Sequence, residues 1–133
     1  GDNGLDNGST FNNNAGGEIA IDNSLVIGLD NLSGIFTNAA KILIGANGSV
    51  GGEGLLNRST FNNNAGGDIV IDNSTFNGLR NNSSGTFTNV AKITIGANGS
   101  VGGIGLHNQN IFNNSSFSTY LNTICSKNNL EDR

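Results

Sequence analysis

The segment between residues 54 and 104 contains one pattern twice. The first copy reads Gly54-Leu55-Leu56-Asn57, then Phe61-Asn62-Asn63-Asn64-Ala65, then Asp68-Ile69-Val70-Ile71. The second copy reads Gly78-Leu79-Arg80-Asn81, then Phe87-Thr88-Asn89-Val90-Ala91, then Lys92-Ile93-Thr94-Ile95. Both copies follow the order Gly-Leu-x-Asn, a short polar gap, Phe-x-Asn-x-Ala, a charged residue and Ile-x-Ile. An internal repeat of this size is typical of solenoids, propellers and arrays.

The pattern continues on both sides and divides the chain into five coils. They cover residues 4–27, 28–53, 54–77, 78–104 and 105–114 onward, and the four complete coils have 24 to 27 residues. Odd coils contain Asn-Asn-Asn-Ala-Gly-Gly at 12–17 and 62–67, whereas even coils end in Ile-Gly-Ala-Asn-Gly-Ser-Val-Gly-Gly at 44–52 and 95–103. The pattern is lost after residue 114. We therefore expect a solenoid over 1–114, and a degenerate last coil with a C-terminal cap or tail over 115–133.

The apolar residues of each coil alternate with polar ones, which is the period of a β-strand. Gly and Asn are too frequent for long helices, and a propeller blade would need four strands in a longer repeat. About 24 residues with three short strands and three turns fit one rung of a triangular parallel β-helix. In the first coil we expect strands near Leu5–Asn7, Phe11–Ala15 and Glu18–Asp22. The predicted fold class is an all-β parallel solenoid of about five coils.

Equivalent residues of stacked coils lie about 4.8 Å apart, so the repeat predicts ladders along the solenoid axis. We expect the apolar ladders to line the lumen and the asparagine ladders to support the corners, where Asn tolerates turn conformations. The phenylalanine ladder contains Phe11, Phe36, Phe61, Phe87 and Phe112, and the leucine ladder contains Leu5, Leu29, Leu55, Leu79 and Leu106. The asparagine ladders are Asn7, Asn31, Asn57, Asn81, Asn108 and Asn13, Asn38, Asn63, Asn89, Asn114.

A fifth ladder is electrostatic. The residue before each Ile-x-Ile or its equivalent is, coil by coil, Glu18, Lys41, Asp68 and Lys92. Opposite charges on neighbouring strands stabilise a sheet by roughly 0.2–1 kcal/mol, whereas like charges destabilise it. The alternation of sign therefore favours this register and explains why the coils come in unlike pairs.

The composition excludes several partners. The formal net charge is −4 and no basic run is present, which argues against nucleic acid and against an anionic membrane surface. No apolar segment is long enough to span a bilayer. The chain begins at Gly1 without Met or a signal peptide, so we expect a mature piece or fragment of something larger. Cys125 is the only cysteine, so no disulfide forms within the chain.

The runs at 28–44 and 78–95 resemble the Gly-x-x-Asn…Thr-Phe-Thr-Asn…Thr-Ile-x-Ile repeats of bacterial surface and adhesin-like proteins. Those repeats are similar to right-handed parallel β-helix proteins such as filamentous haemagglutinins and autotransporter passengers. The resemblance covers roughly residues 4–114. It implies a right-handed helix and an exported, fibrous or adhesive role outside the cell or at its surface, and it carries over no catalytic motif.

Metal binding finds little support in the sequence. The Ca²⁺-binding nonapeptide is Gly-Gly-x-Gly-x-Asp-x-apolar-x, and the Gly-Gly runs at 16, 51 and 102 all lack a carboxylate at the ligand position. We expect Asp22 and Asp72 to cap turns instead. We therefore predict no metal and no cofactor.

Catalysis finds little support either. Glu18 and Asp68 would lie two rungs apart, near the spacing that glycoside hydrolysis needs, but Lys41 stands between them. His107 occupies the variable slot of Gly-Leu-x-Asn, where Asp6, Asp30, Leu56 and Arg80 stand in the other coils, and we expect this slot to face solvent. Cys125 has no neighbouring base in the sequence. We expect no enzyme.

The sequence thus predicts a non-catalytic structural or adhesive solenoid segment. Its expected partners are another copy of the chain stacked along the axis, or a glycan or other cell-surface ligand. A carbohydrate-binding or polysaccharide-degrading β-helix is the first alternative. An ice-binding solenoid is the second, although Thr10, Thr37, Thr60 and Thr88 do not share one register.

Overall fold

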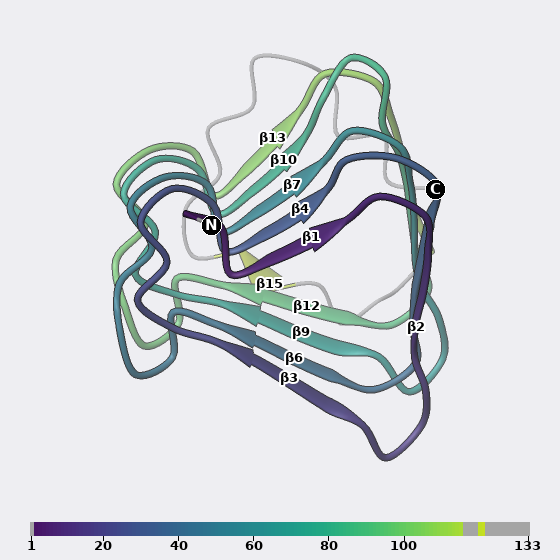
Figure 1. Cartoon of the computed structure of the whole chain (residues 1–133), viewed down its shortest axis with the longest axis horizontal. Helices are drawn as coiled ribbons and strands as arrows, with labels where there is room; N and C mark the ends of the chain where they lie inside the picture. The colour runs from purple at the N-terminus through teal and green to yellow at the C-terminus, as the bar shows by residue number, and fades with distance from the viewer. Residues whose placement is uncertain (1, 116–119, 122–133) are drawn as a thin grey trace.

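The computed structural model describes residues 2–115 and 120–121, and it shows a parallel β-solenoid with no helix in these residues. Three sheets form the sides of a triangular prism (Figure 1), and each has five strands in the described part of the chain. The predicted fold class is confirmed. The handedness of the coil stays a prediction.

Each coil contributes one strand to each sheet, and all pairings are parallel. The first sheet contains β1 (Leu5–Asn7), β4 (Leu29–Asn31), β7 (Leu55–Asn57), β10 (Leu79–Asn81) and β13 (Leu106–Asn108). The second sheet contains β2 (Thr10–Asn13), β5 (Ile35–Asn38), β8 (Thr60–Asn63), β11 (Thr86–Asn89) and β14 (Ile111–Asn114). The third sheet contains β3 (Glu18–Ile21), β6 (Lys41–Ile44), β9 (Asp68–Ile71), β12 (Lys92–Ile95) and β15 (Tyr120–Leu121).

Odd and even coils differ at all three corners. Between the first and second sheets, odd coils use residues 8–9 and 58–59, whereas even coils use the longer segments 32–34 and 82–85. Odd coils turn from the second to the third sheet through residues 14–17 and 64–67, whereas even coils use only residues 39–40 and 90–91. Even coils have the longer loop from the third to the first sheet, over 45–54 and 96–105 against 22–28 and 72–78 in odd coils. The longer corner of odd coils offsets the longer loops of even coils only in part, yet the strands of unlike coils keep one register.

Two predicted strand boundaries differ from the structure. The second strand of the first coil is Thr10–Asn13 rather than Phe11–Ala15, and the third is Glu18–Ile21 rather than Glu18–Asp22. The chain leaves the second strand because Asn13 turns into the corner, where a backbone bond from Gly17 N–H to the Asn14 carbonyl (2.9 Å) closes a turn with Gly16 at φ 86°. Asp22 caps the loop of the next coil, as described below.

Residues 115–133 were predicted to form a degenerate last coil and a cap or tail. Residues 120–121 form β15, whose backbone pairs with β12, so the last coil still reaches the third sheet. The rest of this segment, apart from residue 115, lies outside the described residues, and so does Cys125.

The lumen contains the apolar ladders. The five phenylalanine rings stack face to face along the axis, with centroids 4.8, 4.7, 4.7 and 5.0 Å apart and planes within 12° of parallel. The three central rings, Phe36, Phe61 and Phe87, are fully buried. The leucines of the first sheet and the isoleucines of the third close the other two sides of the same core cluster. Five rungs therefore share one continuous core, to which all three sheets contribute side chains.

Two asparagine ladders support the corners on either side of the second sheet. In each ladder the Nδ2 group of one Asn donates to the Oδ1 atom of its equivalent in the next coil at 2.7–2.9 Å, without a break from Asn7 to Asn108 and from Asn13 to Asn114. The same amides donate to corner carbonyls; Asn31, for example, bonds the Thr60 carbonyl at 2.9 Å. The ladders therefore satisfy polar groups of the backbone where the strands end.

A glycine column makes the close approach of neighbouring coils possible where the chain enters the first sheet. A Cβ atom at Gly54 would overlap Ile71 Cγ2 and would lie 2.7 Å from the Gly78 carbonyl oxygen. Gly4, Gly28 and Gly78 have equivalent surroundings. The glycine of Gly-Leu-x-Asn is therefore required by contact with both the lumen and the next coil.

The glycine column predicts a position-specific loss of stability. Gly54→Ala is expected to lower the free energy of unfolding by about 1–3 kcal/mol, because the added methyl group overpacks the core. Gly8→Ala is the control, since a Cβ at Gly8 has no atom within 4 Å. Urea denaturation of the two variants measures the difference, and equal midpoints would contradict the packing argument.

The asparagine ladders predict a contrast within one tripeptide. Asn63→Ala removes the bonds to Asn38, Asn89 and the Lys92 carbonyl, and a buried group left unpaired costs about 1–3 kcal/mol. Asn64→Ala changes an exposed side chain and should shift the free energy of unfolding by less than about 0.5 kcal/mol. Thermal unfolding followed by circular dichroism compares the two; a similar loss in both would show that the ladder is not the cause.

Candidate binding faces

With the lumen closed by apolar and amide ladders, the side chains available for contacts are those that point outward. The predicted phenylalanine, leucine and asparagine site residues all lie inside, as described above. The candidate sites are therefore the outer face of each sheet and the loops at the corner between the third and first sheets.

The outer face of the third sheet carries the charge ladder. Glu18, Lys41, Asp68 and Lys92 are direct register partners on consecutive strands. Lys92 Nζ lies 3.7 Å from Asp68 Oδ1, and this is the ladder's one ion pair within 4.0 Å among the described residues. Because the Lys92 side chain is half exposed, this pair stabilises the fold by less than about 1 kcal/mol. A second column on this face contains Ala20, Leu43, Val70 and Thr94.

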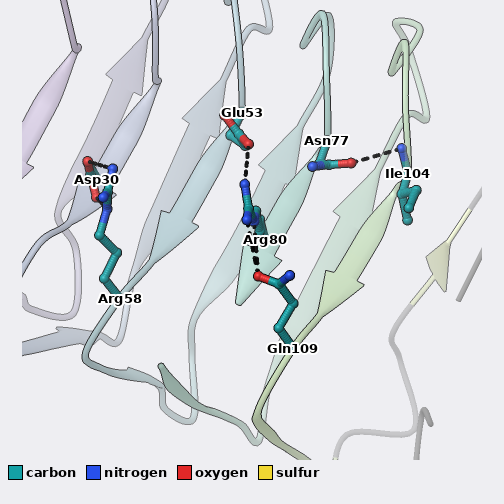
Figure 2. Close-up of polar contacts among 7 residues, drawn as sticks. All are labelled: Asp30, Glu53, Arg58, Asn77, Arg80, Ile104 and Gln109. Atoms are coloured by element: carbon teal, nitrogen blue, oxygen red, sulfur yellow. Dashed lines mark hydrogen bonds and ion pairs between the residues drawn. The ribbon is translucent and has the colours of Figure 1, made fainter. Parts of the chain in front are cut away.

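The outer face of the first sheet corrects one expectation. The variable slot of Gly-Leu-x-Asn was expected to face solvent, but Asp30 is only 1% exposed and Leu56 only 5%. Arg58 covers Asp30: its Nε and Nη2 atoms donate to the two carboxylate oxygens at 3.1 Å each (Figure 2). Leu56 is flanked in register by Asp30 and Arg80. The expectation was wrong for these two positions, because it neglected side chains that reach across from neighbouring coils, whereas Asp6 in the first coil is exposed.

A second ion pair lies further along the same face. Arg80 Nη1 donates to Glu53 Oε1 at 3.3 Å, and its Nε and Nη2 atoms donate to Gln109 Oε1 at 3.3 and 3.2 Å (Figure 2). His107 is the register partner of Arg80 and is partly exposed. Sequence reasoning missed both arginine pairs. The available signal was that each arginine has a carboxylate 27 or 28 residues before it, about one coil away.

Burial changes the protonation behaviour of Asp30. Desolvation raises the pKa of its carboxyl above the ordinary value of 3.8; Arg58 opposes this shift, and the nearby carboxylates of Asp6 and Glu53 add to it. The bidentate guanidinium is thus the one described group that favours the charged form of Asp30.

The loops between the third and first sheets are closed by polar side chains. Asp22 Oδ1 accepts a hydrogen bond from Asn47 N–H at 3.0 Å, and Asp72 Oδ1 accepts from Asn98 N–H at 3.1 Å. Each carboxylate therefore caps the loop of the next coil. Asn77 Oδ1 likewise accepts from Ile104 N–H at 3.1 Å (Figure 2). Among the described residues, no group of three His, Cys, Asp or Glu side chains is arranged to hold a metal ion.

The same loops expose apolar side chains in odd coils. Leu25 is 75% exposed and Phe76 59%, whereas the even coils have Gly51-Gly52 and Gly102-Gly103 at the equivalent rungs. A Cβ atom at Gly52 would lie 3.7 Å from the Phe76 ring, so this ring leans over the glycine below it. The loop edge is therefore an irregular apolar ridge.

The outer face of the second sheet differs from the other two because it carries no charge. Its first column contains Thr10, Ile35, Thr60, Thr86 and Ile111, and its second column contains Asn12, Thr37, Asn62, Thr88 and Asn113. Thr10 and Thr60 lie in the first column and Thr37 and Thr88 in the second, so the four threonines do not share one register but belong to one face. Only the strand assignment places them together.

Comparisons with protein-family models, with curated proteins and with solved structures gave no match to this chain. The structure contains no helix, among the residues it describes, that could cross a membrane. The properties of the three faces therefore have to be argued from this chain's own residues.

The Asp30–Arg58 pair predicts a pH-dependent effect of mutation. Arg58→Ala should lower the free energy of unfolding by about 1–3 kcal/mol at pH 7, because it leaves a buried carboxylate unpaired. Since the folded-state pKa of Asp30 lies above its unfolded value, ionisation costs stability as the pH rises between the two, and the cost grows without Arg58. At pH 3, where the carboxyl is protonated in both states, the loss should be small.

Chemical denaturation at both pH values measures this effect, and Asp30→Asn supplies the control background. In that background Arg58→Ala should cost little and equally at pH 3 and pH 7. A loss of the same size at both pH values in the otherwise unchanged protein would mean that Arg58 acts through packing alone.

Proposed function

We propose that this chain is a non-catalytic structural and adhesive segment of an extracellular or cell-surface protein. The observation that carries the proposal is that many of its amide and carboxylate side chains are bonded within the coil stack. The interior amides form ladders and the carboxylates Asp30, Glu53 and Asp68 pair with cations, while Asp22 and Asp72 cap loops. Groups held in this way hold the coil in shape, which suits a rigid scaffold that presents its outer faces.

The extracellular location is supported by the resemblance of the repeats to those of bacterial surface and adhesin-like proteins. A single cysteine and a low content of charged residues are compatible with it. A scaffold of this kind can be lengthened by adding coils that repeat the same contacts, since each coil packs only on its neighbours.

Self-association along the axis is part of this proposal. Within the described part of the chain, no strand pairs with the outer edges of β1, β2 and β3, and Leu5, Phe11 and Ile19 are only partly buried there. The asparagine ladders all run in one direction, with Nδ2 of each coil donating to the following coil. A head-to-tail stack would continue the same ladders, and a heterologous contact of this kind extends into a fibre.

Negative-stain electron microscopy tests this proposal on the purified chain at neutral pH, with and without Ca²⁺. We expect filaments of stacked coils under both conditions, because the contacts invoked are strand pairing and apolar stacking. Phe11→Lys should abolish the filaments, since a charge that points into the stack blocks edge pairing.

Asn12→Lys is the matched control, because Asn12 lies on the same strand but points outward. It should leave the filaments intact. Discrete monomers of the unchanged chain would refute stacking and leave a lateral face as the adhesive surface. Filaments that form only with Ca²⁺ would contradict the proposal that strand pairing and apolar stacking hold the stack together without a metal.

A carbohydrate-active module is the second candidate, and one observation favours it. Asp6 and Asp30 are register partners on adjacent strands, one exposed and the other buried with a raised pKa, as in an acid–base pair. However, Arg58 occupies both oxygens of Asp30. Release of reducing sugar from polysaccharides by the unchanged chain, lost in Asp30→Asn, would establish this candidate in place of the first.

A further inference from the structure

The second sheet presents a surface of one chemical type. Its ten outward side chains are five threonines, three asparagines and two isoleucines, so the face is neutral and has no aromatic ring and no long flexible side chain. All ten are at least partly exposed, including Ile35 at 44% and Ile111 at 50%. The three ion pairs found among the described residues lie on the other two sheets and their adjoining loops.

The polar groups of this face are not paired with one another or with neighbouring coils in the described residues. In the part of the chain that the structure describes, no hydrogen bond joins these hydroxyl and amide groups to another residue. The inward asparagines of the same strands behave in the opposite way, because each is bonded to the next. The eight outward groups therefore remain available to a ligand or to ordered water.

The spacing of these groups is regular, and the ordered core on the inner side of the sheet maintains it. The phenylalanine rings on the inner side repeat every 4.7–5.0 Å, and the asparagine ladder at the strand ends has the same register. The two outward columns lie two residues apart along each strand, which is about 6.6 Å. Thr and Ile are β-branched and stiff at χ1, so most of the array loses little freedom on binding.

The size of the face argues against a protein partner. Five rungs and two columns cover on the order of 300 Å². A stable protein–protein interface needs about 800 Å² from each partner. The ligand should therefore be a periodic surface whose binding depends on a match between its repeat and the spacing of the side chains, rather than on a large buried area.

We propose that the outer face of the β2–β5–β8–β11–β14 sheet is an ice-binding surface. An ice crystal is neutral, flat and periodic, and its water molecules both donate and accept hydrogen bonds, as the Thr and Asn side chains do. The rung spacing is close to the shortest repeat of the ice lattice, and the Thr and Ile methyl groups can hold water between them in an ordered arrangement. A single sugar chain fits less well, because the ten side chains that make up this face include no aromatic ring on which sugars could stack. This inference does not rest on the proposed function.

The experiment is partition of the full chain into ice grown slowly on a cold probe, with the protein measured in ice and in the remaining liquid. The unchanged chain should be enriched in the ice. Asn62→Lys places a long charged side chain in the centre of the face and should lower the enrichment at least fivefold. Val70→Lys is the matched control, since Val70 is the third residue of the next strand in the same coil and is equally half-buried, but lies on the third sheet. It should behave like the unchanged chain.

A third variant tests the lattice itself. Asn62→Thr gives three consecutive threonines in one column, together with Thr37 and Thr88, and enrichment should be equal or higher. Circular dichroism confirms that each variant is folded. Exclusion of the unchanged chain from ice overturns the proposal, as does an equal loss in Asn62→Lys and Val70→Lys. Retention of the unchanged chain on insoluble neutral polysaccharide, with no enrichment in ice, assigns the face to a glycan and also overturns it.

Discussion

The bond between stacked asparagine amides is the interaction on which the rest of this structure depends. A triangular coil must turn sharply, and each turn leaves backbone carbonyl groups without a strand partner next to an apolar lumen. One side-chain amide satisfies the corner and links the coils, because it donates to the corner carbonyl and to the Asn of the next coil. The unbroken ladders hold neighbouring coils in register, since a shift of one residue would unpair every amide and move the phenylalanines out of the lumen.

The register tolerates variation only where it does not disturb this stacking. Odd and even coils differ in length at all three corners, yet the strands remain aligned because the extra residues stay in the connecting segments. The close approach of neighbouring coils at Gly54 requires the absence of a side chain. The loops, by contrast, can carry residues as different as Phe76 and Gly52 at equivalent positions of successive coils. The lumen is therefore constrained coil by coil, while the exterior can diversify.

That freedom explains why the three outer faces differ. On the first sheet, arginines neutralise the buried Asp30 and the partly exposed Glu53, and the third sheet alternates charge from strand to strand. The second has neither, and its Thr, Asn and Ile side chains are held in a regular array by the ordered core behind them. A regular interior thus produces a regular exterior wherever the outward residues are small and neutral.

The sequence by itself determined the coil, its approximate period, the inward ladders and the order of charges, because strand alternation and a recurring motif leave one stacking arrangement open. It did not determine the strand ends, which depend on where Asn13 turns into the corner. Burial of Asp30 under Arg58 and the joining of threonines from two registers into one face also required the tertiary structure. Both arise from contacts between coils about 25 residues apart, and such contacts follow from how outward side chains lie across neighbouring rungs rather than from the repeat pattern.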